Sequence, residues 1–235
     1  MDDERPDWSS RDPAFLAVLE SAAHLQQLVP DAVVVGGTAA ALYADHRLST
    51  DHDQVLADLG DHFEMVLEAL EADRGWATNR VTPGKVILGN LDGIEAGVRQ
   101  MIRRVPLETA ELRLPSGATL TVPTSDETLR IKAFLVVRRN QTRDYLDVAA
   151  LADHAGIAHA AEVLAHLDDF YADQLASPDG VSSQLVRQLA DPHPADPAVI
   201  GQLDRYKRLH RRWTQWPKVL RVTRDLAAAM TEAPR

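Results

Sequence analysis

The sequence predicts an α+β fold in which a β-rich first half is followed by a helical second half. Segments with β-branched residues and alternating polarity concentrate before residue 123. From Pro123 onward the apolar residues recur with the 3.6-residue period of helices. Strands grouped in one half and helices in the other are typical of α+β proteins. We therefore expect a core over residues 14–122 and a helical C-terminal domain over residues 123–235.

Turn and cap signals define the elements of the first half. Pro13 starts an apolar helical pattern, the short apolar run that follows predicts a buried strand, and a Gly-Gly pair gives a tight exit into the next helix. Asp92-Gly93 is a favoured two-residue hairpin turn, and Pro-Ser-Gly marks a second hairpin. The expected helices cover 14–28, 38–45 and 61–73, and the expected strands cover 33–35, the segment with Asp51 and Asp53, and two hairpins over 84–102 and 111–122.

The second half is predicted to consist of helices separated by turns and prolines. Thr124 or Ser125 caps a helix that runs to about residue 139, and Thr142 caps one that ends near Gly156. Further helices are expected at about 158–176, 181–190 and 196–214.

Composition indicates an ordinary globular protein. Of its 235 residues, 45% are apolar and 26% are charged, which suffices for a substantial core. The first thirteen residues are polar and acidic, and no apolar run approaches the roughly 20 residues of a membrane helix. We therefore expect a soluble, cytoplasmic protein with no membrane association. The absence of cysteine excludes disulfides, thiolate metal ligands and a cysteine nucleophile.

Residues 33–53 combine an anion-binding pattern with a metal-binding pattern. A glycine pair between a strand and a helix places backbone N–H groups and the helix dipole where they favour anions. In an extended strand a two-residue step points side chains the same way, so Asp51 and Asp53 share a face and can hold the same Mg²⁺. Arg47 and Ser49 continue that two-residue step. Together these features indicate a nucleotidyl-transfer site.

Charge is distributed unevenly along the chain. The net charge is −10, yet residues 204–224 contain eight Lys or Arg and one Asp, a local charge of about +7. A basic arm of this kind is suited to RNA phosphates. An equally open interpretation is a solvated helix face with Trp213 and Trp216 packed inward.

The chain resembles the AbiEii/AbiGii-type nucleotidyltransferase toxins of bacterial toxin–antitoxin systems, including the MenT-like branch. The resemblance covers most of residues 30–155, and the order and spacing of the motifs carry it. The matching motifs are Gly36-Gly37, Arg47-x-Ser49-x-Asp51-x-Asp53, Lys132 and Arg143-Asp144-x-x-Asp147.

The resemblance implies a polymerase-β-like nucleotidyltransferase core with a mixed sheet, completed by the helical domain. It also implies transfer of a nucleotide from an NTP to RNA, in MenT-like members to the 3′ end of tRNA, which stops translation. The expected cofactor is Mg²⁺ or Mn²⁺. The expected partners are an NTP, tRNA and a cognate antitoxin protein.

Residue roles follow from the same resemblance. Catalytic roles fall on Asp51, Asp53, Lys132 and Asp147, of which Asp51 and Asp53 hold the metal. Lys132 neutralises triphosphate charge, and Asp147 orients the sugar, Lys132 or a metal-bound water. Nucleotide-binding roles fall on Gly36, Gly37, Thr38, Arg47, Ser49 and Asp144. Ser49 is in addition a candidate regulatory phosphorylation site, with Thr50 as the alternative. The expected RNA contacts, Arg208, Arg211 and Arg212, come from the basic segment and not from the resemblance.

Structural explanations stay open for several of these residues. Lys132 suits a surface position on an amphipathic helix, and Asp144 suits a helix first turn, where an acid balances the dipole. Asp147 is spaced to pair with Arg143 at i,i+4. The superfamily commonly has a third carboxylate on a later strand, and Glu95, just after the first hairpin turn, is the obvious candidate. His46 is expected to be a surface or packing residue.

Two other functions compete with nucleotidyl transfer. His52-Asp53 supplies the residue pair of HD-type metal-dependent phosphohydrolases, whose fold is all helical. The predicted strands disfavour that fold, and alternation places His52 opposite the two aspartates. A noncatalytic nucleotide- or RNA-binding regulator would keep the fold without turnover, and the joint presence of Asp51, Asp53 and Lys132 disfavours it.

Overall fold

A computed structural model describes residues 8–174, 179–206 and 208–233. The chain divides into two compact units, each assembled from three separate stretches. The first unit contains residues 1–39, 49–102 and 108–123, and the second contains residues 40–48, 103–107 and 124–235. The break after residue 123 lies where the sequence pattern changes. The two short insertions into the second unit have no counterpart in that pattern.

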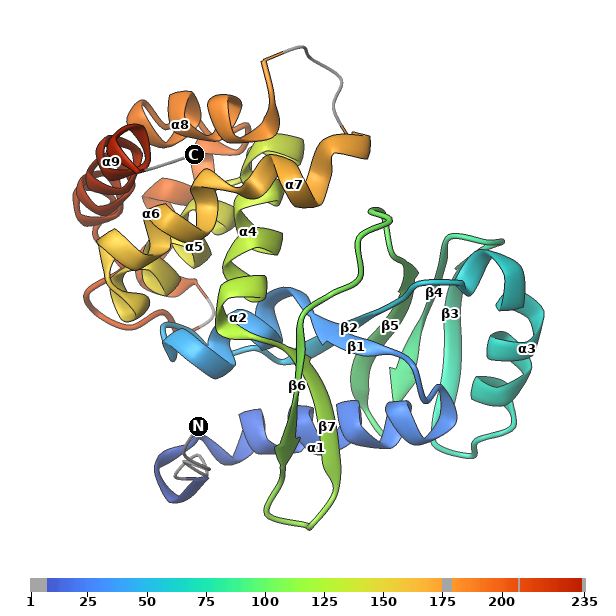
Figure 1. Cartoon of the computed structure of the whole chain (residues 1–235). Helices are drawn as coiled ribbons and strands as arrows, with labels where there is room; N and C mark the ends of the chain where they lie inside the picture. The colour runs from blue at the N-terminus through green and yellow to red at the C-terminus, as the bar shows by residue number, and fades with distance from the viewer. Residues whose placement is uncertain (1–7, 175–178, 207, 234–235) are drawn as a thin grey trace. The chain divides into compact units, whose positions relative to one another are not determined.

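The first unit is built on a mixed sheet with the strand order β1-β2-β5-β4-β3 (Figure 1). Its strands are β1 (Val33–Val35), β2 (Asp51–Leu56), β3 (Trp76–Thr82), β4 (Val86–Leu91) and β5 (Ile94–Gln100). β2 pairs with β5 in parallel, whereas the other neighbouring pairs are antiparallel. The sheet is therefore mixed, as predicted, and the parallel pair lies where Asp51 and Asp53 begin β2.

One face of this sheet is covered by two helices. α1 (Pro13–Leu28) and α3 (Leu59–Glu71) pack onto it and bury apolar side chains of β2, β4 and β5. Along β2, every second side chain is buried, beginning with His52 and Gln54. His52 Nε2 lies 3.1 Å from Ser21 Oγ, and Gln54 donates to the Ala22 carbonyl oxygen, so both polar side chains anchor the strand to α1.

A separate hairpin completes the first unit. β6 (Thr109–Arg113) and β7 (Thr119–Pro123) pair in antiparallel fashion, and β7 packs on β1 and α1. The amide of Gln26 on α1 both donates to and accepts from the Thr121 backbone, at 2.9 and 2.8 Å. This contact fixes the register of the hairpin against α1.

The second unit is helical. Thr124 caps the N-terminus of α4, because its hydroxyl accepts from the Glu127 backbone N–H at 3.1 Å. Asn140, in the left-handed conformation, caps the C-terminus of the same helix. A continuous apolar core joins the helices of this unit. Its elements are α4 (Ser125–Arg139), α5 (Thr142–Ala155), α6 (Ile157–Ala165), α7 (Leu167–Tyr171), η2 (Ala172–Gln174), α8 (Val181–Ala190), η3 (Pro197–Arg205) and α9 (Trp216–Glu232).

Helix α2 (Gly36–Ala44) starts in the first unit and ends in the second, and η1 (Trp8–Ser10) precedes α1. Across the described ranges, no helix has both the length and the apolar character needed to span a bilayer.

Several predicted boundaries are wrong. The helix expected at 158–176 is broken into α6, α7 and η2, and residues 175 and 176 lie outside the described part. The helix expected at 196–214 is the 3₁₀ helix η3, which ends at Arg205. Two elements, β3 and α9, were not predicted from the sequence. The strand expected from Arg47 begins only at Asp51, so Arg47 and Ser49 precede it in irregular backbone.

Candidate functional site

The glycine turn lies against the carboxylate of Asp53. Gly36 follows β1 with φ +73°, a conformation that favours glycine, and begins α2. A Cβ added at Gly36 would lie 3.8 Å from Asp53 Oδ2. Thr38 Oγ1 donates to the Asp51 carbonyl oxygen at 2.6 Å, which ties the first turn of α2 to the start of β2. Within the first unit, the predicted anion-binding turn and the predicted metal ligands are therefore neighbours.

Asp51 and Asp53 share the face of the sheet opposite to α1 and α3. Burial alternates along β2, with Asp51 and Asp53 half-buried and His52 buried on the face covered by α1. This is the arrangement that the two-residue spacing predicted. Arg47 does not take part in it, because the strand starts after it.

Glu95 belongs to the same face as the two aspartates. The parallel register pairs Asp51 with Glu95 and Asp53 with Gly97, and aligned residues of neighbouring strands point to the same side. Glu95 is exposed. A Cβ at Gly97 would lie 2.7 Å from Leu88 Cδ2 and 3.0 Å from Asp53 Oδ1, so glycine at this position lets the Asp53 carboxylate approach the β5 backbone closely.

Arg99 also reaches this face and was not singled out from the sequence. Its Nε donates to Asp53 Oδ1 at 2.9 Å, with the Arg99 and Asp53 side chains 45% and 36% exposed. The signal for it was present in the sequence, because Glu95, Gly97 and Arg99 follow the same two-residue step on β5.

The carboxylates on this face of the sheet suit a hard divalent cation, but they are few. Asp51, Asp53 and Glu95 offer carboxylate oxygens, the ligands that Mg²⁺ and Mn²⁺ prefer. Among the residues that the structure describes, no group of three or more His, Cys, Asp or Glu gathers closely enough to hold a metal. The carboxylate chemistry fits such a cation, and Asp51 and Asp53 are the residues that would hold it.

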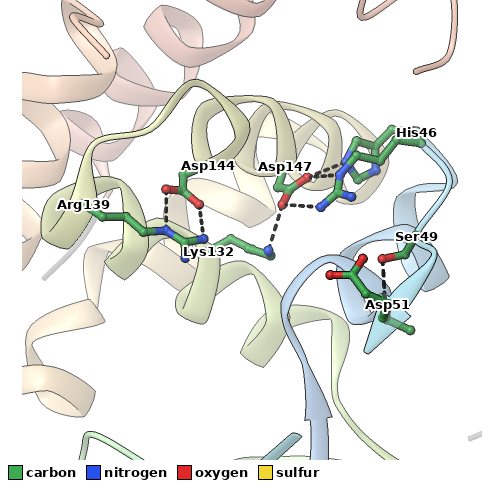
Figure 2. Close-up of polar contacts among 9 residues, drawn as sticks. His46, Ser49, Asp51, Lys132, Arg139, Asp144 and Asp147 are labelled. Atoms are coloured by element: carbon green, nitrogen blue, oxygen red, sulfur yellow. Dashed lines mark hydrogen bonds and ion pairs between the residues drawn. The ribbon is translucent and has the colours of Figure 1, made fainter. Parts of the chain in front are cut away.

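A second set of predicted site residues forms a buried cluster around Asp147 in the second unit (Figure 2). Asp147 Oδ1 lies 2.7 Å from His46 Nε2 and 2.9 Å from Arg47 Nε. Asp147 Oδ2 lies 3.2 Å from Arg47 Nη2 and 2.8 Å from Lys132 Nζ. The side chains of His46 and Asp147 have no exposed surface, and that of Lys132 is 2% exposed. Asp147 does not pair with Arg143 in this set of contacts.

The cluster keeps Asp147 ionised. Burial alone would raise the pKa of Asp147, but Arg47, Lys132 and the His46 hydrogen bond outweigh it and hold the pKa well below its ordinary value. Burial lowers the pKa of Lys132, although Asp147 acts against the shift. Burial likewise lowers the pKa of His46, and the neighbouring Arg47 and Lys132 add to the effect.

Asp144 is committed to a different partner. It is fully buried and accepts two hydrogen bonds from Arg139, Nε to Oδ2 at 2.8 Å and Nη2 to Oδ1 at 2.6 Å (Figure 2). The bidentate pair ties the end of α4 to the start of α5. Asp144 therefore does more in this fold than balance a helix dipole.

The sites expected in the loop before β2 are buried. Arg47 is 7% exposed and directs Nε and Nη2 at Asp147. Ser49 is 1% exposed, with its Oγ 3.1 Å from Thr38 Oγ1 and donating weakly to the Asp51 carbonyl oxygen at 3.3 Å. Thr50 is exposed. A kinase would reach Ser49 only if this loop opened, whereas Thr50 is accessible as it stands.

The basic segment of residues 204–224 divides into exposed and packed residues, and Lys207 lies outside the described part. Arg208 and Arg211 are exposed. Arg212 pairs with Asp153, and its guanidinium lies 5.0 Å from the ring centroid of Trp213. Trp213 is buried and Trp216 packs edge-on against Tyr145, with centroids 6.2 Å apart. The inward packing of both tryptophans confirms that part of the solvated-face interpretation.

The fold is similar to that of a solved nucleotidyltransferase toxin. Among solved structures it is similar to MenT4, nucleotidyltransferase toxin Rv2826c from Mycobacterium tuberculosis H37Rv, with a TM-score of 0.62. The match covers 96% of this chain and 87% of that chain at 20% sequence identity. The predicted α+β fold with a mixed sheet and a helical C-terminal half is thereby confirmed, as is its resemblance in fold to a MenT toxin.

Sequence comparison finds partial relatives of another kind, and no family model matches the chain. The heme uptake protein MmpL11 of Mycobacterium tuberculosis H37Rv is 38% identical over 138 residues, which cover 57% of this chain and 13% of the relative. The mycolic acid-containing lipids exporter MmpL11 of Mycolicibacterium smegmatis is 46% identical over 94 residues, covering 40% and 10%. The chain thus spans only a small fraction of the length of these relatives.

Proposed function

We propose that this protein is a metal-dependent nucleotidyltransferase that transfers a nucleoside monophosphate from an NTP to the 3′ end of tRNA and so inhibits translation. One observation carries the proposal. Asp51 and Asp53 project from one face of β2 beside a glycine turn, with Glu95 on the neighbouring parallel strand, in a fold similar to that of MenT4.

The first unit supplies the groups for the chemical step. In the proposed reaction, the 3′-hydroxyl oxygen of the acceptor bonds to the α-phosphorus of the NTP while the bond from that phosphorus to pyrophosphate breaks. Glu95, exposed on the aspartate face, accepts the hydroxyl proton. Asp51 and Asp53 would hold Mg²⁺ or Mn²⁺, which when bound supplies Lewis-acid stabilisation of the phosphoryl charge.

The backbone turn at Gly36 and Gly37 is proposed to receive the β and γ phosphates, together with the amide of Thr38. Amides at the start of a helix favour anions, and the missing side chain at Gly36 allows the backbone close to the triphosphate. The hydrogen bond from Thr38 to the Asp51 carbonyl keeps this turn beside the carboxylates.

The second unit is proposed to contribute Lys132 as the cation for the triphosphate. An ammonium has three N–H donors, and the contact with Asp147 uses one of them. Asp147 is fully buried and orients Lys132, which is one of the three roles implied for it by the resemblance. Arg47 and Asp144 act on the nucleotide through this framework, because their side chains pair with Asp147 and Arg139.

The RNA acceptor is proposed to bind through the basic segment, chiefly through the exposed Arg208 and Arg211, with Arg212 contributing less because it pairs with Asp153. A toxin of this class also requires an antitoxin, and we propose a protein partner that blocks nucleotide or tRNA access. Expression of the chain alone should arrest bacterial growth, and expression of the Asp53→Ala variant should not.

The decisive assay incubates the protein with each labelled NTP, Mg²⁺ and total tRNA. The wild type should label tRNA at its 3′ end, and Asp53→Ala should lose labelling by at least 100-fold because a metal ligand is removed. Glu111→Ala, which removes an exposed carboxylate from β6, is the matched control and should retain full labelling. Equal labelling by Asp53→Ala and wild type would reject the metal role of Asp53.

Lys132→Ala tests the triphosphate contact. We expect the NTP concentration for half-maximal labelling to rise at least tenfold, with Lys85→Ala, an exposed lysine of the first unit, unchanged. An unaltered NTP dependence would remove Lys132 from nucleotide binding.

The two competing functions have different requirements. An HD-type phosphohydrolase would require His52 on a helix among other histidines, whereas it lies on β2 with its side chain 2% exposed and next to Ser21. A noncatalytic regulator would bind NTP or tRNA without transferring label.

A further inference from the structure

We infer that His46 is a positioning residue for the Lys132–Asp147 pair, acting as a neutral imidazole that donates from Nε2 to Asp147. The inference rests on the proposed function in so far as it assigns Lys132 and Asp147 to nucleotide binding. His46 belongs to none of the motifs that carry the resemblance, and its spacing in the sequence points only to a packing residue.

The contacts of Asp147 form a clamp with two sides. Arg47 spans both carboxylate oxygens, with Nε on Oδ1 and Nη2 on Oδ2. This contact fixes the two oxygens in the plane of the guanidinium, but by itself it would still allow the carboxylate to rotate out of that plane. His46 Nε2 holds Oδ1 at 2.7 Å, so Oδ2 stays directed at Lys132 Nζ, 2.8 Å away. His46 thus acts on Lys132 through the carboxylate that both contact.

The charges around His46 determine which nitrogen carries its proton. The ionisable groups that face it are Asp147, Arg47 and Lys132, all in the second unit. Two basic side chains already surround one carboxylate, so a further positive charge on the imidazole is unfavourable in this buried place. A neutral imidazole has one N–H, and a short contact with an ionised carboxylate requires that N–H at Nε2.

The other ring nitrogen makes this arrangement costly. His46 Nδ1 is buried, and within the described residues it has no hydrogen-bond partner. A buried unsatisfied polar atom is destabilising, and an apolar side chain at this position would avoid that cost. Among the residues that the structure describes, the His46 side chain hydrogen-bonds to Asp147 alone, so its presence is best explained by what that bond does for the carboxylate.

The backbone of His46 connects the same cluster to the basic segment. Its carbonyl oxygen accepts from the His210 backbone N–H at 2.7 Å, between the exposed Arg208 and Arg211. The connection is made by the main chain, so a side-chain substitution at His46 tests the clamp and leaves this hydrogen bond in place.

Two substitutions separate the donor from the volume of the side chain. His46→Gln places an amide N–H close to where the imidazole Nε2–H lies, whereas His46→Leu fills similar space without a donor. His159→Leu is the matched control, because His159 makes an exposed 2.9 Å contact with Asp126 in the same unit. Dissociation constants for a nonhydrolysable NTP analogue with Mg²⁺ are measured by calorimetry for all four proteins.

We expect His46→Leu to weaken analogue binding at least tenfold, His46→Gln to stay within threefold of wild type, and His159→Leu to be unchanged. A second readout is independent of the nucleotide: nitrogen-15 NMR should show His46 as the neutral Nε2–H tautomer at pH 7. The Lys132 ammonium signal, protected by its carboxylate partner, should persist in the Gln variant and broaden in the Leu variant.

The outcomes distinguish this inference from the proposed function. A wild-type protein that binds no NTP, yet shows the tautomer and the dependence of the Lys132 signal on His46, would reject the proposed function and keep the positioning role. A Leu variant with wild-type affinity and an unchanged Lys132 signal would overturn the inference. If the Leu variant fails to fold, the Gln variant decides: a folded Gln variant with weakened binding would also overturn it.

Discussion

Asp147 illustrates how a single carboxylate can hold three basic side chains in place. His46, Arg47 and Lys132 all direct nitrogen atoms at its two oxygens, and the group is closed off from solvent. Buried ions are costly unless they are paired and hydrogen-bonded. The carboxylate therefore stabilises the second unit in addition to any effect on the reaction.

Removing this carboxylate should destabilise the fold. Asp147→Ala removes the carboxylate that the buried Arg47 and Lys132 both contact, and we expect the free energy of unfolding to fall by about 3–5 kcal/mol. Urea denaturation followed by circular dichroism measures it. Asp169→Ala, whose side chain is 75% exposed, should change it by less than about 0.5 kcal/mol. A loss of activity in Asp147→Ala without any loss of stability would contradict the structural role.

The buried His46 predicts a dependence of stability on pH. Its pKa is lowered in the folded state, whereas in the unfolded chain it is near 6.5. Below about pH 6.5 the unfolded state therefore binds a proton that the folded state does not, and the free energy of unfolding falls toward the lowered pKa. His46→Gln should flatten this slope in urea titrations between pH 7 and 5, and an identical slope in the variant would show that His46 titrates normally.

At the scale of elements, the predicted strands and helices that were correct are those with local signals. The hairpin at Asp92-Gly93, the cap at Thr124 and the strand of alternating burial at β2 each follow from residues within a few positions of one another. β3 was missed because it is an edge strand whose side chains are mostly exposed, so it lacks the alternation of a half-buried strand. α9 was not predicted because its first half belongs to the basic segment and was interpreted by its charge. Its apolar residues nevertheless recur every three to four positions, as in a helix.

The β3–β4 pairing depends on a glycine. A Cβ at Gly89 would lie 2.3 Å from Trp76 Cζ2 and 2.7 Å from the Ala77 carbonyl oxygen, and the backbone contact cannot move aside easily. We expect Gly89→Ala to cost about 1–3 kcal/mol, measured as a lowered midpoint of thermal unfolding. Gly201→Ala, where a Cβ would meet nothing within 4 Å, should leave the midpoint nearly unchanged. Equal midpoints for Gly89→Ala and wild type would mean that β3 shifts freely.

At the scale of the whole molecule, the chain is acidic overall, whereas its basic residues are concentrated in residues 204–224. A net charge of −10 opposes RNA binding except where a local excess of basic residues outweighs it. The exposed part of that excess is smaller than the sequence implied, because Arg212 pairs with Asp153.

RNA binding should therefore respond to two arginines. Arg208→Glu combined with Arg211→Glu should weaken tRNA binding by at least tenfold and reduce the slope of log K against log salt by about one unit per lost phosphate contact. Filter binding across a salt series measures both. Arg74→Glu combined with Arg80→Glu, two exposed arginines of the first unit, makes the same change in total charge and is the control. Equal slopes for the three proteins would place RNA elsewhere on the molecule.

Only part of the candidate site could be predicted from the sequence, because the rest joins residues that are far apart in the chain. Asp51 and Asp53 follow from the period of a strand, which is a local property, whereas Glu95 was named from the resemblance together with its position after a turn. The cluster joins residues 46 and 47 to residues 132 and 147, and no periodicity connects positions so distant in the chain. The resemblance to a known family singled out Arg47, Lys132 and Asp147, but it gave no reason to add His46.

The threading of the chain has a consequence for how this protein can be divided. Residues 40–48 carry His46 and Arg47 into the second unit, so a gene fragment starting at residue 124 would encode Lys132 and Asp147 without two of their partners. Such a fragment should express as an insoluble or protease-sensitive product, and adding back residues 40–48 through a designed linker is the shortest route to rescue. Exchange of these units between genes would meet the same obstacle, because neither unit is one continuous stretch of the sequence.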